Sequence, residues 1–363
     1  MARTPVYTKV KDILQARILA GEYVVHDLPG ERKIAAETGV SYMTARKAVA
    51  ELIAEKILAR RPNGTLIVHP AHRDAHAVAS AVLLVPAYPS SHLARCRIEI
   101  ARVATDHRVR LRTIEYTYWY DSIITEAMQG ADGLFIIPST EELPDHLLDA
   151  FVDGSNRVVF FDADMSDRGI PSIRLFAEPH FRALFDHVKE TGRERIDCLN
   201  TQGHNDEILQ RLASWRVWAE TNGVEGKAWD HPVEPFEDPI EAAHAVVYGI
   251  VTGSDPKPDA LVCTTYPAAV GAVRALRDQG IEAGVDIAVC SMNIEFPGRF
   301  ASPSITGLEF PDIEPLLVGV FEWFKADNAS SNGSGDTSNW SGQHLIVPKE
   351  PALFIGETTR PRG

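Results

Sequence analysis

Polar and aromatic side chains directly follow several apolar runs in the larger, C-terminal part of this 363-residue sequence. They include carboxylates, amides, hydroxyls and rings. Planar polar groups bond vicinal hydroxyls and rings cover C–H faces, so this mixture suits a small hydroxylated ligand. The positions are 88–91, 118–121, Ser139, Thr140, Asp162, Asp164, Asn205, 264–266, Asn293 and Glu295.

The apolar runs that precede these side chains predict buried parallel strands. They span residues 81–85, 111–116, 133–137, 158–161, 196–199, 260–263 and 287–290. Helical patterns lie between them, for instance at 93–106, 179–190, 209–221, 239–252 and 268–279. Alternating strands and helices predict a doubly wound α/β fold, which binds ligands at the carboxyl ends of its strands. The polar set therefore falls where a ligand site is expected.

Catalytic motifs are missing from the sequence. The 13 histidines are spread without an HExxH pattern, and neither GxSxG, GxxxxGK(S/T) nor a strand-linked GxGxxG is found. Cys96, Cys198, Cys263 and Cys290 have no CxxC spacing, which favours reduced core thiols over a metal site. We therefore expect no enzyme activity, no cofactor and no metal ion.

Residues 5–69 follow a different pattern, that of three short helices. The first carries Val10, Ile13, Leu14 and Ile18 on one apolar face. The second opens near Glu31, whose charge suits a helix N-terminus, and ends at the turn of Gly39. We expect these helices to pack together as a small domain of their own.

The third helix begins after Ser41, a residue type that caps helix N-termini well. Its spacing turns Ala45, Ala48, Val49 and Leu52 inward. The outward positions near its start are Tyr42, Met43, Thr44, Arg46 and Lys47. Residues 57–68 then alternate around Asn63-Gly64, the strongest short hairpin signal, and predict a β-wing.

This segment resembles the winged helix-turn-helix of the GntR family. Residues 28–35 match the family pattern LP-x-ER-x-(LI)A, residues 39–46 match G-V-S-x-x-T-x-R, and Gly64-Thr65 match the end of its wing. The sequence departs from the family at His26, where Gly is usual, and at Tyr42, where a basic or small polar residue is common.

The resemblance implies double-stranded DNA as a partner. Arg32 and Arg46 would contact phosphates or guanine edges, and Ser41 and Thr44 the DNA backbone or bases. Tyr42 would face the bases, while Asn63 and Gly64 would approach the minor groove.

Charge is divided between the two parts of the chain. Residues 1–70 hold 11 Lys and Arg against 7 Asp and Glu, whereas residues 71–363 hold 25 against 43. An acidic surface repels DNA, so the basic segment is the part expected to approach phosphate.

Residues 79–358 resemble the effector domain of LacI/GalR-type repressors, which is itself similar to periplasmic sugar-binding proteins. Four short motifs carry the resemblance in order: Arg211 to Trp215, Pro258 to Cys263 with Ala269 and Gly271, Gly284 to Val289, and Ser302 to Thr306. An aminotransferase body, known in other fusions of a similar head, would need a Schiff-base lysine at a strand end or turn. None of Lys189, Lys227, Lys257, Lys325 and Lys349 has that setting.

The second resemblance implies an effector site between two lobes. Arg211 matches the sugar-binding arginine of the family, and Asp162 lies where a strand-end Asp bonds a sugar hydroxyl. Thr265-Tyr266 stand in place of an Asn-Asp pair, and Asn293 in place of a ligand Asp. Ser90 completes the predicted effector set.

The chain has 363 residues, more than a single domain core normally holds, so we expect more than one domain. We expect a winged helix-turn-helix at 1–69, a linker at 70–78 and an effector domain at 79–358. Within the latter, an N-lobe would take about 79–175 and 311–329, and a C-lobe about 176–308 and 343–356, with crossings near 176, 310 and 340.

These features predict a DNA-binding transcriptional regulator, a repressor of a carbohydrate-utilisation operon, that acts as a homodimer on operator DNA. A sugar or sugar-like effector would favour one placement of the lobes and so alter the spacing of the two heads. No apolar run long enough to span a membrane and no secretion leader is visible, so a cytoplasmic protein without a membrane partner is expected. The alternative is a ligand sensor with a non-sugar or anionic effector that acts mainly through protein partners.

Overall fold

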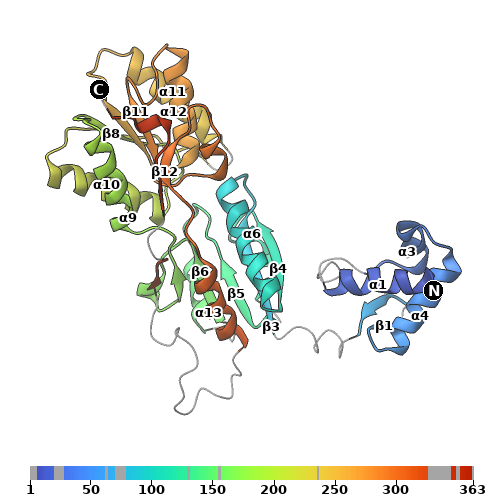
Figure 1. Ribbon diagram of the computed structural model, residues 1–363. Helices are drawn as coiled ribbons and strands as arrows, with labels where there is room; N and C mark the ends of the chain where they lie inside the picture. The colour runs from blue at the N-terminus through green and yellow to red at the C-terminus, as the bar shows by residue number, and fades with distance from the viewer. Residues whose placement is uncertain are drawn as a thin grey trace.

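The computed structural model describes residues 6–19, 28–61, 64–69, 79–128, 131–153, 157–234, 237–325, 345–348 and 352–361. Its elements fall into three groups: an N-terminal head (residues 6–69) and two sheets that form the body (Figure 1). No helix among these residues has the length and apolar character needed to cross a membrane.

The head contains three helices and one hairpin. They are α1 (Val6–Leu19), α3 (Glu31–Thr38), α4 (Tyr42–Ala54), β1 (Leu58–Arg60) and β2 (Leu66–Val68). Both α1 and α3 pack on α4, and β1 pairs antiparallel with β2. Gly39 ends α3 in the left-handed conformation with φ 66°, which favours glycine. The predicted helix-turn-helix with a wing is confirmed.

The core of the head follows the predicted pattern except at one position. Leu14, Ile34, Ala45 and Leu52 are all buried. Ile13, expected on the apolar face of the first helix, is instead 41% exposed. The buried positions of α1 are Val10 and Leu14, one helical turn apart on the side that meets α4, and Ile13 points away from that side.

The first sheet of the body has the strand order β13-β7-β6-β5-β3-β4, and all its described pairs are parallel. Its strands are β3 (Ala79–Pro86), β4 (Val109–Tyr116), β5 (Gly133–Ile136), β6 (Arg157–Phe161), β7 (Ser172–Ile173) and β13 (Leu345–Ile346). Its helices are α6 (Ser91–Asp106), α7 (Ser122–Ala127), α8 (Asp145–Asp153), the short η1 (Ser166–Arg168) and α13 (Glu314–Lys325). We call this unit the N-lobe.

The second sheet has the order β14-β12-β11-β10-β8-β9, with β14 antiparallel at its edge. Its strands are β8 (Ile196–Asn200), β9 (Ala228–Asp230), β10 (Ala260–Cys263), β11 (Ala288–Ser291), β12 (Thr306–Leu308) and β14 (Leu353–Phe354). Its helices are α9 (Glu178–Glu190), α10 (Asp206–Asn222), α11 (Pro239–Thr252), α12 (Tyr266–Asp278), η2 (Phe296–Arg299) and η4 (Glu357–Thr359). We call this unit the C-lobe.

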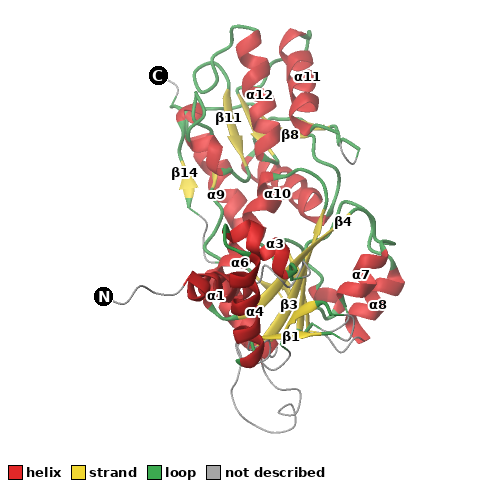
Figure 2. Cartoon of the chain, turned by 90° about the vertical axis from the view of Figure 1, so that its right-hand side faces the viewer, coloured by secondary structure: helices red, strands yellow, loops and turns green. Residues whose placement is uncertain are grey.

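Alternate residues of the strands belong to different apolar clusters, and Figure 2 shows the helices that flank the sheets. In the C-lobe, Leu261 packs in one cluster with residues of α11 and α12, while Val262 packs in another with residues of α9 and α10. In the N-lobe, Leu134 faces α7 and α8, and Phe135 faces α6 and α13. Strands buried on both faces explain the continuous apolar runs in the sequence, and the predicted doubly wound α/β fold is confirmed.

The chain passes between the lobes after β7, after β12 and after β13. The third passage differs from the expected one near residue 340. Leu345–Ile346 still pair with β7 in the N-lobe sheet, although residues 343–356 were all expected in the C-lobe. This strand is too short to leave a periodic signal, so the sequence placed the passage too early.

Candidate functional site

The start of α4 presents a polar, exposed surface on the head. Ser41 caps the helix, since its hydroxyl accepts a hydrogen bond from the Thr44 amide at 3.2 Å. Tyr42 and Met43 are 42% and 67% exposed, and Arg46 is exposed on the next turn. The predicted cap and the predicted outward face are therefore both present.

The wing lies against α3 through one ion pair. Arg60 of β1 bonds the Glu31 carboxylate at the start of α3 and also donates to the Gly64 carbonyl at 3.0 Å. Gly64 has φ +83°, a conformation that side-chain-bearing residues rarely adopt. Arg32 is exposed on α3, on the same small domain. Asn63, the other predicted wing residue, lies outside the described residues.

A cavity of about 530 Å³ lies between the two lobes of the body. Its lining includes Ser90, Ser91, His92, Thr140 and Asp162 from the N-lobe, and Asn205, Glu207, Arg211, Thr265, Asn293 and Glu295 from the C-lobe. Five of the six predicted effector residues are thus brought together. The carboxyl ends of the two sheets meet here, as expected for open α/β sheets.

Asp162 and His92 form a close pair on the N-lobe side. Asp162 directly follows β6 with φ 57°, and its Oδ2 accepts a hydrogen bond from His92 Nε2 at 2.6 Å. Burial raises the pKa of Asp162, but His92, Arg211 and Arg174 lower it by more. Burial lowers the pKa of His92, whereas Cys96 and Asp162 raise it well above its usual range. Asp162 Oδ1 is buried and accepts no hydrogen bond from any described residue.

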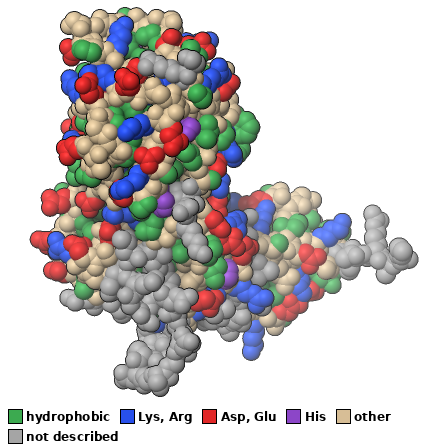
Figure 3. Space-filling model, turned by 60° about the vertical axis from the view of Figure 1, so that its left-hand side comes forward, with side chains coloured by type: hydrophobic (Ala, Val, Ile, Leu, Met, Phe, Trp, Pro, Cys, Tyr) green, Lys and Arg blue, Asp and Glu red, His purple; other side chains and the backbone are tan. Residues whose placement is uncertain are grey.

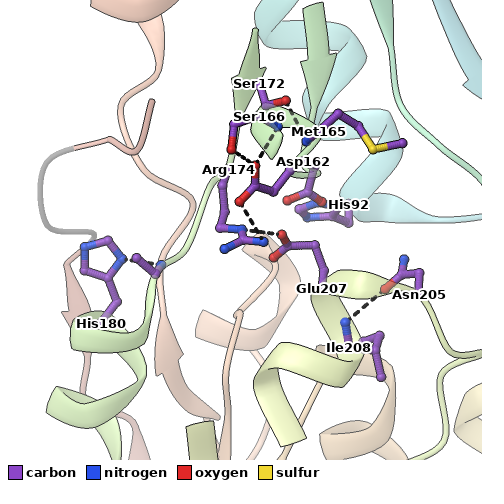
Figure 4. Close-up of polar contacts among 12 residues, drawn as sticks. His92, Asp162, Met165, Ser166, Ser172, Arg174, His180, Asn205, Glu207 and Ile208 are labelled. Carbon is purple, nitrogen blue, oxygen red and sulfur yellow. Dashed lines mark hydrogen bonds and ion pairs between the residues drawn. The ribbon is translucent and has the colours of Figure 1, made fainter. Parts of the chain in front are cut away.

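Glu207 carries the C-lobe side of the same polar cluster (Figure 4). Its Oε1 accepts a hydrogen bond from Arg174 Nε at 2.7 Å, and Arg174 also lies 3.5 Å from Asp164. Burial, followed by repulsion from Asp162, raises the pKa of Glu207 to about 7. Within the described chain, Glu207 Oε2 is buried without a hydrogen-bond partner.

Arg211 lies one turn after Glu207 on α10 and is only 4% exposed. Its Nη1 donates to the Thr264 carbonyl at 2.7 Å and to Asn293 Oδ1 at 3.2 Å. The guanidinium carbon is 5.6 Å from the ring centre of Phe176 and 5.8 Å from that of Phe181. Arg211 Nε is buried and donates to none of the described groups.

The remaining predicted effector residues divide into two kinds. Thr265 lines the cavity, and its Oγ1 is buried with no partner among the described residues. Ser90 also lines it, although its hydroxyl caps α6 by accepting from the Leu93 amide at 3.2 Å. Tyr266 is not part of the lining. As the first residue of α12, it packs against the apolar cluster of α11 and α12 instead.

Three residues of the cluster were not singled out from the sequence: His92, Arg174 and Glu207. The position of Glu207 could have been found, because it precedes Arg211 by four residues and shares its helix face. Arg174 follows only the two-residue strand β7, and His92 lies in α6, one residue beyond the polar positions 88–91 that the sequence marked.

One further contact joins the lobes at the cavity rim. The Ser91 hydroxyl, in the first turn of α6, donates to the Glu295 carboxylate after β11. Burial raises the pKa of Glu295. Together with Arg174 and Glu207, this contact holds the two lobes against each other around the cavity.

Two family models match separate parts of the chain. Residues 6–68 match the model for bacterial regulatory proteins of the gntR family. Residues 185–312 match the model for a periplasmic binding protein-like domain. The chain joins a GntR-type helix-turn-helix domain to a periplasmic-binding-protein-like domain. Both predicted resemblances are confirmed at this level.

The HTH-type transcriptional regulator GalR of Streptococcus thermophilus is 23% identical over 141 residues. The match covers 38% of this chain and 42% of GalR, so it spans less than half of that relative.

Solved structures of LacI-family regulators share the fold of the body. One from Bifidobacterium animalis subsp. lactis gives a TM-score of 0.63 at 13% identity and covers 79% of this chain and 100% of its own. One from Arthrobacter sp. FB24, in complex with lactose, gives a TM-score of 0.62 at 16% identity. This match covers 78% of the present chain and 99% of the Arthrobacter chain. The dimeric Lac repressor with an 11-residue C-terminal deletion gives a TM-score of 0.59 at 16% identity. This match covers 78% of the present chain and 100% of the repressor chain. These relatives are described as regulators or repressors, not as enzymes.

Proposed function

We propose that this protein is a ligand-controlled transcriptional regulator. The head binds operator DNA, and a small carbohydrate bound between the lobes changes the affinity of that binding. The observation that carries the proposal is the cavity itself. It is lined by both lobes and holds buried, unpartnered polar atoms of Asp162, Glu207, Arg211 and Thr265 on the part of the chain that the structure describes.

The bound DNA would meet the exposed start of α4. Ser41 caps this helix, Tyr42 and Thr44 lie on its first turn and Arg46 on the next, and Arg32 lies on α3 of the same domain. Acidic and basic side chains alternate over the body on the face that Figure 3 shows. The body carries the excess of acidic residues, so phosphate would be attracted to the head instead.

A sugar fits the cavity for two reasons. Amide, hydroxyl, carboxylate and guanidinium groups converge there from both lobes, which is the chemistry that binds vicinal hydroxyls. In addition, one structure with the same fold was solved in complex with lactose. We further propose that the protein represses a carbohydrate-utilisation operon, that the sugar is the effector that controls this repression, and that the protein acts in the cytoplasm, where its operator lies.

The mechanism we propose is differential binding. A sugar that prefers one placement of the lobes shifts the population toward it, and in a homodimer this changes the spacing of the two heads. The domain bounds in this proposal are 1–69 for the head, 70–78 for the linker and 79–358 for the effector domain. Leu345–Ile346 were expected in the C-lobe from the sequence, but they are assigned here to the N-lobe because they pair with β7.

The decisive experiment selects bound duplexes from a random pool with the full chain and then measures mobility shifts on the selected sequence. Steep weakening by salt is expected, because each phosphate contact releases counterions. Addition of one sugar from a panel of pentoses and hexoses should change the affinity. Selection of no sequence, or sequence-specific binding that no ligand alters, would overturn the proposal. A sensor that acts through protein partners would give the first of these results.

A further inference from the structure

Acidic side chains outnumber basic ones in the lining of the interlobe cavity. The lining carboxylates are Asp162, Glu207, Glu234, Glu237, Asp238 and Glu295, and the lining cations are His92 and Arg211. Arg174, which is not part of the lining, pairs with Glu207 and with Asp164, a further carboxylate outside the lining. The cavity therefore holds a negative field, which opposes an anionic ligand and attracts a cationic one.

The buried atoms without partners show the same bias in hydrogen bonding. Asp162 Oδ1 and Glu207 Oε2 can only accept while they are ionised, and Thr265 Oγ1 can accept or donate. Arg211 Nε is a donor. Leaving such a group unpaired costs about 1–3 kcal/mol. An occupant that supplies mainly donors would relieve most of this cost.

The two carboxylates lie in one cluster. Both interact electrostatically with Arg174 and Arg211, and Asp162 acts on Glu207 strongly enough to contribute to its raised pKa. In Figure 4 the side chains of His92, Asp162, Arg174 and Glu207 point toward one another. A group with several donors and a positive charge could thus bond carboxylates of both lobes at once.

We propose that the effector is a carbohydrate that carries a protonated amine, with its ammonium group at Asp162 and Glu207. This inference rests on the proposed function only in taking the interlobe cavity as the effector site. Arg211 does not oppose it, because its charge is held by the Thr264 carbonyl, Asn293 and two aromatic rings, and its Nε suits a hydroxyl oxygen of the same sugar. The raised pKa of Glu207 supports the inference, since binding of a cation would release its proton.

Calorimetry on the full chain without DNA tests the inference. The probes are glucosamine, galactosamine and mannosamine, their parent hexoses, their N-acetyl derivatives, and glucuronate and galacturonate. One amino sugar should bind about 10-fold or more tightly than its parent hexose and its uncharged N-acetyl derivative, as expected for a charged hydrogen bond. Equal or tighter binding of a hexose or a uronate, or no binding of any amino sugar, would overturn it.

Two variants of α10 sharpen the test. Glu207→Gln keeps the size of the side chain but removes its charge. The variant should reduce the difference in affinity between the amino sugar and its parent hexose, which we call the affinity gap. Glu220→Gln, on the exposed face of the same helix, should leave the affinity gap unchanged. An unchanged affinity gap in Glu207→Gln would contradict the proposal.

The outcomes also separate this inference from the proposed function. If a neutral hexose alone alters operator affinity, the regulator stands and the amine requirement fails. If the amino sugar binds but no duplex is selected, the ligand class stands and DNA regulation fails.

Discussion

Arg174 bonds Glu207 at 2.7 Å and so links the segment after β7 to the first turn of α10 in the other lobe. Ser91 and Glu295 make a second link at the cavity rim. Both links include a carboxylate that lines the cavity. A ligand that bonds these carboxylates would share them with the links, and under the proposed mechanism this sharing would couple occupancy of the cavity to the relative placement of the lobes.

The stability of the body should depend on pH through Glu207. The pKa of this group is about 7 in the folded chain against an ordinary value of 4.5, so the folded state holds a proton that the unfolded chain has lost. Stability therefore falls as pH rises from 4.5 to 7, by about 3 kcal/mol when the change is complete. Glu207→Gln should raise the urea midpoint at pH 8 and change it little at pH 5.

Glu220→Gln is the matched control for this measurement and should shift the midpoint equally at both pH values. A difference between wild type and Glu207→Gln that is the same at pH 5 and pH 8 would contradict a raised pKa at this position.

Substitution by valine should change the stability of the protein in opposite directions at Thr265 and at Thr264. Thr265 Oγ1 is buried with no described partner, so Thr265→Val should stabilise the free protein by about 1 kcal/mol and weaken sugar binding. Thr264 Oγ1 donates to Asn200 Oδ1 at 2.7 Å, so Thr264→Val should destabilise it by a similar amount or more. Thermal unfolding and calorimetry check both, and a loss of stability in Thr265→Val would count against an unpaired hydroxyl.

Arg46→Ala should weaken operator binding. If Arg46 contacts a phosphate, the affinity should fall for all sequences and the slope of log affinity against log salt should drop by about 1. If it contacts a base, the loss should be about 1–3 kcal/mol and specific to one position. Arg182→Ala removes the same charge from an exposed position on α9 of the body and is the control. Equal binding by the two variants would remove Arg46 from the interface.

Ser41 allows its capping role to be separated from its DNA contact. Ser41→Ala should lower the stability of the head by about 1 kcal/mol, because the hydroxyl that accepts from the Thr44 amide is lost. Ser41→Asp should keep the cap but place a negative charge at the predicted phosphate surface. We expect Ser41→Asp to keep the head stable, as measured by thermal unfolding, but to abolish DNA binding, as measured by mobility shift. Full binding by this variant would exclude a phosphate near Ser41.

Most of the fold could be predicted from the sequence where the signal is long. The apolar runs that became β3, β5, β10 and β11 are buried on both faces, and continuous runs of this kind rarely occur elsewhere. Strands of two or three residues, such as β7, β12 and β13, carry no period of their own. Their places are decided by pairing with neighbours, which is why the third passage between the lobes was misplaced.

The site was predicted in part for a related reason. Arg211, Asp162 and Asn293 were found because they follow strands or match a family motif, and they do converge. Tyr266 lies outside the cavity lining, because one position along a helix turns a side chain away from the cavity and toward the apolar cluster of α11 and α12, against which it is partly buried. His92 bonds Asp162, which is 70 residues away in the sequence, and Arg174 bonds Glu207, which is 33 residues away. No local sequence pattern marks such distant pairs.

Strand β14, the last of the C-lobe sheet, has a consequence for how the protein is made. The head precedes the body along the chain, so a ribosome synthesises it first, whereas the C-lobe sheet is complete only once residues 353–354 have followed and Arg193 can donate to the Arg360 carbonyl. The head is thus synthesised long before the lobe that would control it. A product truncated before residue 352 would keep the head and lack the edge of its sensor, so it would be expected to occupy DNA without responding to the effector.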